Sequence, residues 1–198
     1  MLTKTTSTVA NSYTWDVENR LTGAVTTQAD GTITSVGFLY DPFGRRIRKA
    51  SASGTTIYAY DGANIVAELN AAGSITASYT QGLGVDEPLA MRRAGAAYYY
   101  NADGLGSVTS LANAAGTVKQ SYVYDTFGNT TSTGTITNPY QYTGREFDSE
   151  TGLYYYRARY YDPSIGRFIS EDPLGFRAGE DFYTYGAGLP DLLHQFHC

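Results

Sequence analysis

The chain has 198 residues, a net charge of −5, 42% hydrophobic residues and 17% charged residues. This balance excludes a disordered chain, which carries more charge and fewer aromatic residues. It also makes nucleic acids and anionic membranes poor partners, because both are negatively charged. The 19 tyrosines and 22 glycines favour strands joined by turns, so composition alone predicts an all-β protein.

Cysteine usage and hydropathy exclude two further features. The single cysteine, Cys198, leaves no partner for an intrachain disulfide. No run of about 18 apolar residues is present, so no membrane-spanning helix is predicted. The polar residues 1–6 lack the pattern of a secretion signal.

An aromatic–x–aromatic pattern, usually followed by aspartate, recurs from the N-terminus onwards. It appears first at residues 13–16, then at 38–41 and 58–61. The second aromatic of each unit, or the single aromatic that fills a gap, is Trp15, Tyr40, Tyr60, Tyr79, Tyr100, Tyr124, Tyr142, Tyr161 or Tyr185. A mean spacing of about 21 residues is typical of a protein built from one repeated unit.

Two series of turns alternate along the chain. The first begins with Asp or Asn and ends with Gly, a type I pattern, at residues 41–44, 101–104, 125–128 and 172–175. The second contains Gly31, Gly54, Gly73, Gly95, Gly116, Gly134 and Gly152. Two interleaved series with one period predict a continuous antiparallel meander, with two short strands in each unit.

The repeated tyrosines are predicted to stack as cross-strand pairs on a sheet face that is partly exposed to solvent. The alternative is an aromatic platform that binds sugars. The one basic run, residues 45–49, is interpreted as a solvated strand face or a charged sheet edge. A phosphate-binding patch is the alternative for this run.

Several stretches resemble the YD repeats and the repeat-associated core domain of RHS proteins, and together they cover residues 9–190. Residues 13–21 and 40–46 resemble the YD consensus. Residues 100–108 resemble a neighbouring region of these proteins, with tyrosine and asparagine in place of the usual histidine. The most specific match, to the core domain, runs from 142 to 176. The residues of this chain that carry the family motifs are Tyr40, Asp41, Gly44, Tyr124, Asp125, Gly128, Gly144, Arg145, Gly152, Tyr154, Tyr156, Arg157, Arg159, Tyr160, Tyr161, Asp162, Pro163, Gly166, Arg167, Phe168, Asp172, Pro173 and Gly175.

The resemblance implies a β-sheet that spirals into a hollow shell around a C-terminal toxin or effector, with the core domain closing the shell. The implied partners are that toxin or effector, as in bacterial competition, and the remaining shell segments. The implied location is secreted or at the cell surface, reached by a dedicated secretion system or a missing N-terminal region. Many members of the family also cut themselves after the core domain, through aspartates in two Asp-Pro-x-Gly motifs.

The C-terminal residues depart from the family pattern. The first Asp-Pro-x-Gly motif is present at 172–175, but residues 195–198 replace the second. Asp172 is therefore a candidate catalytic residue, but it lacks the second carboxylate that would let one group act as the acid and the other as the base. A turn-forming role is favoured for Asp172. His194, His197 and Cys198 are a weak signal for a metal site. We expect no metal and no cofactor.

The sequence thus predicts YD repeats over 1–135, a core domain over 136–190 and an atypical tail over 191–198, short and irregular or helical. The predicted function is a non-enzymatic structural fragment of a toxin-enclosing shell. One alternative is a module that binds carbohydrates, including cell-surface glycans. A second alternative is an aspartyl-type autoprotease that cleaves itself at the end of the core domain.

Overall fold

The chain folds into two antiparallel sheets that follow one another along the sequence. The computed structural model describes residues 2–5, 9–177 and 180–185. The first sheet has thirteen strands paired in chain order. These strands are β1 Leu2–Thr5, β2 Val9–Trp15, β3 Leu21–Gln28, β4 Ile33–Tyr40, β5 Arg46–Ser51, β6 Gly54–Asp61, β7 Asn64–Leu69, β8 Ile75–Gln81, β9 Pro88–Arg93, β10 Ala96–Ala102, β11 Val108–Asn113, β12 Val118–Tyr124 and β13 Thr130–Gly134. The second sheet contains β14 Glu146–Asp148, β15 Leu153–Tyr156, β16 Arg159–Asp162 and β17 Arg167–Phe168.

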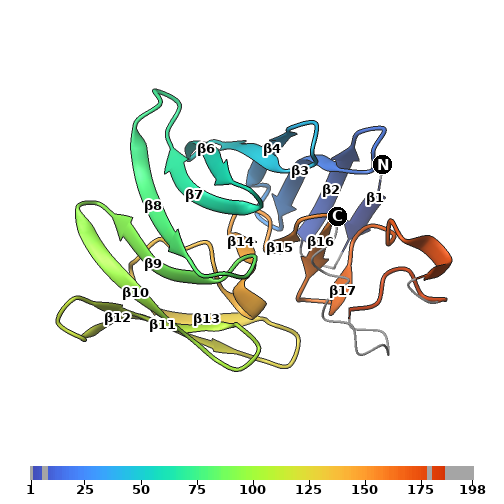
Figure 1. The fold of residues 1–198 in the computed structure, drawn as a ribbon. Coiled ribbons are helices and arrows are strands. Elements are labelled where there is room, and N and C mark those ends of the chain that lie inside the picture. Colours follow the sequence, from blue (N-terminus) through green and yellow to red (C-terminus); the bar gives the residue numbers. More distant parts are fainter. Residues whose placement is uncertain (1, 6–8, 178–179, 186–198) are drawn as a thin grey trace.

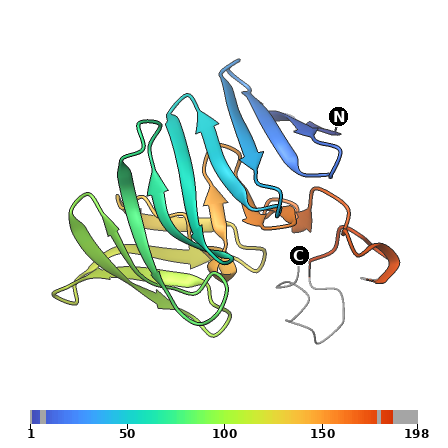
Figure 2. The same ribbon diagram turned by 45° about the horizontal axis from the view of Figure 1, so that its top comes forward.

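The thirteen-stranded sheet, called the wall below, is curved and open. Its first and last strands are not paired with each other. Figures 1 and 2 show the wall curling, with the four-stranded sheet, called the core sheet below, inside the curve. The predicted all-β antiparallel meander is confirmed. The described residues contain no α-helix, only the 3₁₀ turns η1 Tyr142–Gly144 and η2 Gly175–Arg177, and so none of their helices is long and apolar enough to cross a membrane.

Most of the aspartate turns are closed by their own aspartate. In the turn between β4 and β5, one carboxylate oxygen of Asp41 accepts hydrogen bonds from the backbone N–H groups of Phe43 and Arg45, both at 2.9 Å. The other oxygen accepts from Arg45 Nε at 2.7 Å. Asp and Asn side chains cap further turns in the same way at Asp16, Asp103, Asp125, Asn70 and Asn113. The recurrence of aspartate is thus explained by hydrogen bonds within its own turn.

Two of the predicted turns are wrong. The turn predicted at 101–104 forms two residues later, where Gly106 N donates to Asp103 O at 3.0 Å, because β10 continues through Ala102. Gly134 ends β13 and forms no hairpin. With φ at +109°, a Cβ on this glycine would lie 2.3 Å from a carbonyl oxygen of β12. Close strand approach, rather than a turn, therefore explains this glycine.

The second tyrosine of a unit ties neighbouring strands together through its hydroxyl group. The hydroxyl donates to the backbone carbonyl at the start of the preceding strand, from Tyr40 to Leu21 at 2.7 Å, from Tyr60 to Arg46 at 2.9 Å and from Tyr124 to Val108 at 2.6 Å. These bonds satisfy polar groups that are half-buried on the concave face, as buried hydroxyls require. The repeated tyrosine thus supplies both a packed ring and a link between strands.

The apolar interior is shared between the two sheets. Phe38 and other buried residues of β2 to β4 pack in one cluster with Leu153, Tyr155 and Tyr160 of the core sheet. A second cluster lies on strands β6 to β12 and is capped by Tyr140. The core sheet has a third cluster, around Tyr154, on its other side. The core sheet is therefore packed on both faces.

The division predicted at residues 135 and 136 stays a prediction. The change from one sheet to the other falls between Gly134 and Glu146. The predicted irregular or helical tail over 191–198 lies outside the described residues, as do His194, His197 and Cys198.

Candidate functional site: the buried contact between wall and core sheet

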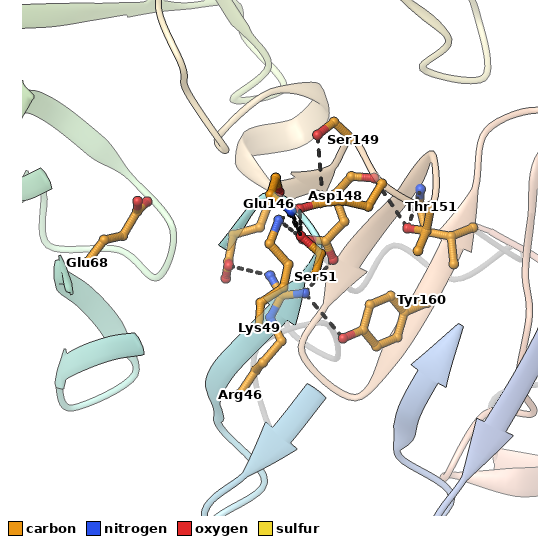
Figure 3. A network of polar contacts seen from close by, with 12 residues as sticks. Arg46, Lys49, Ser51, Glu68, Glu146, Asp148, Ser149, Thr151 and Tyr160 are labelled. Carbon is orange, nitrogen blue, oxygen red and sulfur yellow. Dashed lines mark hydrogen bonds and ion pairs between the residues drawn. The ribbon is translucent and has the colours of Figure 1, made fainter. Parts of the chain in front are cut away.

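A fully buried arginine joins the wall to the core sheet. Arg46, the first residue of β5, is 0% exposed. Its Nη2 donates to Glu146 Oε2 at 2.7 Å, and its Nη1 donates to Asp148 and to the Tyr160 hydroxyl, the latter at 3.3 Å. Figure 3 shows these side chains converging from β5, β14 and β16. The interpretation of the basic run as a solvated face is therefore wrong at Arg46.

Aromatic rings enclose the Arg46 guanidinium. Its central carbon lies 4.4 Å from the ring centre of Tyr155 and 5.3 Å from those of Phe38 and Tyr58. Burial alone would lower the pKa of Arg46. The negative charge of Asp148 and of its other neighbours outweighs burial and raises that pKa well above its ordinary value. The planar guanidinium of arginine can stack on these rings and donate hydrogen bonds to the carboxylates at the same time, so arginine suits this site better than lysine.

Lys49, three residues after Arg46 on β5, extends the charge cluster. Its Nζ lies 3.0 Å from Asp148 Oδ1 and 2.9 Å from Glu150 Oε2. Its side chain is only 16% exposed, so the solvated-face interpretation is wrong here too. The physical reason is that three carboxylates lie against this part of the wall, those of Glu146 and Asp148 in β14 and that of Glu150 in the turn after it.

The two buried carboxylates of β14 differ in their protonation behaviour. Burial alone would raise the pKa of Asp148, but Arg46 and Lys49 together outweigh burial and hold that pKa below its usual value. Burial also raises the pKa of Glu146, and Arg46 offsets this only in part. Asp148 contacts two cations, whereas Glu146 shares one cation with Asp148. Asp148 is thus the firmer anionic anchor.

A second charged contact holds the loop between β8 and β9. The carboxylate of Asp86 pairs with Arg145 and Arg157 of the core segment. Asp86 N donates to Asn64 Oδ1 at 2.9 Å. Asp86 and Arg157 have φ values of +58° and +65°, a left-handed conformation that costs non-glycine residues energy. A Cβ on Gly144 would lie 2.7 Å from Asp86 O, so glycine permits the close approach.

A third contact joins the core sheet to the end of the wall. The Tyr154 hydroxyl lies 2.7 Å from Thr130 Oγ1, and the Tyr161 hydroxyl donates to Phe127 O at 2.8 Å. Asn129 Nδ2 donates to Pro163 O at 3.1 Å. These neutral bonds complete a contact that spans the wall from β5 to β13.

The structure places most of the predicted motif residues on these contacts or in the capped turns. Arg145, Tyr154, Arg157, Tyr160 and Tyr161 lie in the wall–core contact. The motif residues Tyr40, Asp41, Gly44, Tyr124, Asp125 and Gly128 lie at wall turns, and Gly166 packs against Phe127. Arg167 lies apart, on the surface, paired with Asp181.

Sequence reasoning missed Arg46, Lys49, Asp86, Glu146 and Asp148 as functional residues. The basic run at residues 45–49 was the available signal, but period-2 alternation does not separate the buried Arg46 from the exposed Arg48. Glu146 and Asp148 alternate around Phe147, the pattern of a strand with one charged face. Nothing in the irregular loop around Asp86 distinguishes it from a turn residue.

Asp172 adopts the contacts of a turn residue. Its Oδ1 accepts from Leu174 N at 2.9 Å, and its carbonyl oxygen accepts from Gly175 N at 2.9 Å. Its Oδ2 lies 2.8 Å from Arg159 Nη2. The neighbouring Pro173 lines a pocket of about 230 Å³ with residues of the wall turns and of the β15–β16 hairpin. The catalytic role of Asp172 stays a prediction.

Sugar and metal binding find little support among the described side chains. All 19 tyrosines are described, and Tyr99 alone is exposed. The other rings expected to form a sugar platform are therefore buried or partly buried. Within the ranges that the structure covers, no group of three or more His, Cys, Asp or Glu side chains is placed to hold a metal ion.

The family model described as teneurin YD-shell matches residues 3–185. The chain belongs to the teneurin YD-shell family. The resemblance to RHS and YD-repeat proteins drawn from the motifs is confirmed.

Curated relatives and solved structures agree with this family. The chain is 35% identical over 189 residues to the tRNA3(Ser)-specific nuclease WapA of Bacillus spizizenii, covering 90% of the chain and 8% of the relative. It is 27% identical to the double-stranded DNA deaminase toxin A of Burkholderia cenocepacia, covering 87% of the chain and 14% of that relative. The crystal structure of TcdB2-TccC3 has the same fold, with a TM-score of 0.68 and 22% identity over 88% of this chain and 10% of that one. The chain thus spans a small part of the length of the proteins it matches.

Proposed function

We propose that this chain is a wall-and-closure segment of a toxin shell, in which the core sheet closes the space that the wall surrounds. The observation that carries the proposal is the buried contact between Arg46 and the β14 carboxylates. A charge cluster whose central residues, Arg46, Glu146 and Asp148, are buried holds the core sheet inside the curve, where it blocks the interior. Burying several charges costs desolvation energy, so the contact suits a fixed closure better than a transient one.

The proposed role is non-enzymatic. The relatives' names describe a nuclease and a deaminase toxin, yet the chain matches only 8% and 14% of those two proteins. We assign their activities to the parts that this chain does not match. The proposed partners are a C-terminal toxin or effector and further shell segments, and the proposed location is secreted or at the cell surface.

Protease protection tests the closure. The segment is expressed with the flanking sequence that its gene encodes, and the purified protein is treated with trypsin. The proposal predicts that the cargo survives digestion in the wild type and is cut in an Arg46→Met variant. An Arg48→Met variant is the matched control, since Arg48 lies on the same strand and is exposed. Equal digestion of the cargo in wild type and Arg46→Met would contradict the proposal.

Self-cleavage is a second candidate, favoured only by the pocket that Pro173, next to Asp172, lines. The test is the intact mass of freshly expressed protein. A species at the full 21.5 kDa supports the inert role. A product that ends beyond Asp172, and that disappears in Asp172→Asn, supports the protease role.

A further inference from the structure

A pocket of about 230 Å³ lies between the turns of the wall and the core segment. The wall contributes residues of the β2–β3, β4–β5, β6–β7 and β8–β9 connections, and the core segment contributes Tyr155, the β15–β16 turn and Pro173. A cavity of about 150 Å³ holds one benzene molecule, and pockets for drug-sized ligands begin at about 300 Å³. The volume therefore suits a group of about ten non-hydrogen atoms.

Part of the lining is apolar. It consists of Phe43, Ala63, Val85, Tyr155, Ala158 and Pro173. The Phe43 side chain is 82% exposed, so its ring is available to pack on the body of a ligand. The pocket can thus hold an apolar or aromatic group.

The charged part of the lining is mainly positive. Arg20, Arg45 and Arg157 line the pocket, together with a single acidic residue, Glu18. Each arginine also pairs with an aspartate, and none of these aspartates belongs to the lining. In a chain whose net charge is −5, this arrangement favours an anionic group over a cationic one.

Two of these arginines keep a terminal nitrogen without a hydrogen-bond partner among the residues that the structure describes. Arg45 donates through Nε to Asp41 and through Nη1 to Gly62 O, both at 2.7 Å, which leaves its Nη2. Arg157 donates to Asp86 through Nε at 3.1 Å and also through Nη2, which leaves its Nη1. Two donors of the kind that carboxylates accept from are therefore available on side chains of the lining.

The two guanidinium groups lie near one aromatic ring. Their central carbons are 5.1 Å (Arg45) and 5.9 Å (Arg157) from the ring centre of Tyr60. Arg157 also has a φ of +65° in a tight hairpin turn, a conformation that costs a non-glycine residue energy. Strained residues of this kind cluster at binding sites, which supports a role in binding for the Arg157 side chain.

We propose that this pocket binds a carboxylate attached to a small apolar or aromatic group. The two carboxylate oxygens accept hydrogen bonds from Arg45 and Arg157, and the apolar part of the lining packs on the attached group. Inorganic phosphate fits less well, because it has no apolar part. The carboxylate belongs either to a free organic acid or to the C-terminal residue of a peptide. Since both the wall and the core segment line the pocket, the bound ligand joins them.

Calorimetric titration of the full chain with phenylpropionate tests the proposal. Phenylpropionate should bind one to one. Its uncharged amide, phenylpropanamide, should bind at least about tenfold more weakly, because the charge-assisted hydrogen bonds are lost. Inorganic phosphate should bind no better than the amide. A peptide that ends in a phenylalanine with a free carboxylate distinguishes the two sources, since it binds more tightly than phenylpropionate only if the pocket recognises a C-terminus.

Matched variants show whether binding occurs in this pocket. Arg45→Met should weaken phenylpropionate binding about tenfold and leave amide binding unchanged. Arg48→Met, at an exposed arginine outside the lining, should bind like the wild type. Ala63→Trp fills the pocket and should abolish binding, whereas Ala72→Trp, at an exposed alanine of the β7–β8 turn, should not.

Circular dichroism and thermal melting establish that each variant is folded before its binding is compared. The proposal is overturned if the wild type does not bind millimolar phenylpropionate, or if the acid and the amide bind equally well. Binding that survives both Arg45→Met and Ala63→Trp would also overturn it. Phosphate binding tighter than phenylpropionate binding would overturn it in favour of a phosphate site.

Discussion

The wall and the core sheet are stabilised in different ways. The wall uses contacts that repeat within about twenty residues, namely strand pairing, aspartate caps and tyrosine hydroxyl bonds. The core sheet is joined to the wall by ion pairs between residues about a hundred positions apart, such as Arg46 with Glu146 and Asp148. The wall thus follows from a repeated local rule, whereas its closure depends on a few single residues.

Loss of Arg46 is the change expected to have the largest effect. Arg46→Met leaves two buried carboxylates with less compensation, so the free energy of unfolding should fall by about 3–5 kcal/mol. Urea unfolding followed by tryptophan and tyrosine fluorescence measures this. Arg48→Met, on the exposed face of the same strand, should stay within about 0.5 kcal/mol of wild type. Equal effects at the two positions would remove the distinction between wall and closure.

Loss of Asp86 should loosen the core sheet without unfolding the wall. Asp86→Ala removes the carboxylate shared by Arg145 and Arg157, and breaking one buried pair of this kind costs about 3 kcal/mol. Hydrogen exchange should accelerate in β14 to β16 and stay unchanged in β2 to β4. Uniform acceleration across both sheets would show that they unfold as one unit.

The two carboxylates of β14 should give opposite pH dependences. Because the pKa of Asp148 is lowered in the fold, its stabilisation exists at neutral pH and is lost as pH falls through that lowered pKa. Because the pKa of Glu146 is raised, its contribution is present below the ordinary value of 4.5 and is lost as pH rises through the raised pKa.

Unfolding curves between about pH 7 and pH 2 test this pair. Asp148→Asn should be destabilised at neutral pH and should lose less stability on acidification than wild type. Glu146→Gln should lie closer to wild type at neutral pH and should reduce the loss of stability on raising pH above 4.5. If the two variants gave the same profile, the distinction between the two carboxylates would be lost.

A tyrosine hydroxyl of the wall should contribute least. Tyr40→Phe removes the bond to Leu21 O and the contact with the Tyr160 hydroxyl, for a loss of about 1 kcal/mol. Tyr99→Phe, at the exposed tyrosine, is the matched control and should be neutral. Thermal melting distinguishes them, and a loss in Tyr99→Phe as large as in Tyr40→Phe would argue against the strand-linking role.

The wall was predictable from the sequence because each unit repeats the same local chemistry. The strand order could be predicted from the spacing of Tyr40, Tyr60 and Tyr124 and from the glycine turns. The errors at 101–104 and Gly134 arose where strand pairing outweighed local turn preference. The partners of Arg46 were not predictable, because no local pattern specifies which carboxylate a buried arginine meets about a hundred residues later.

A double-mutant cycle between Arg46 and Asp148 tests the central claim most directly. The cycle compares Arg46→Met, Asp148→Asn and the double variant by urea unfolding. If buried ion pairs hold the core sheet in the wall, the second substitution should cost much less once the first is made, with a coupling energy of at least about 1.5 kcal/mol. Additive losses, with coupling near zero, would show that the core sheet is held by packing alone and would contradict the account.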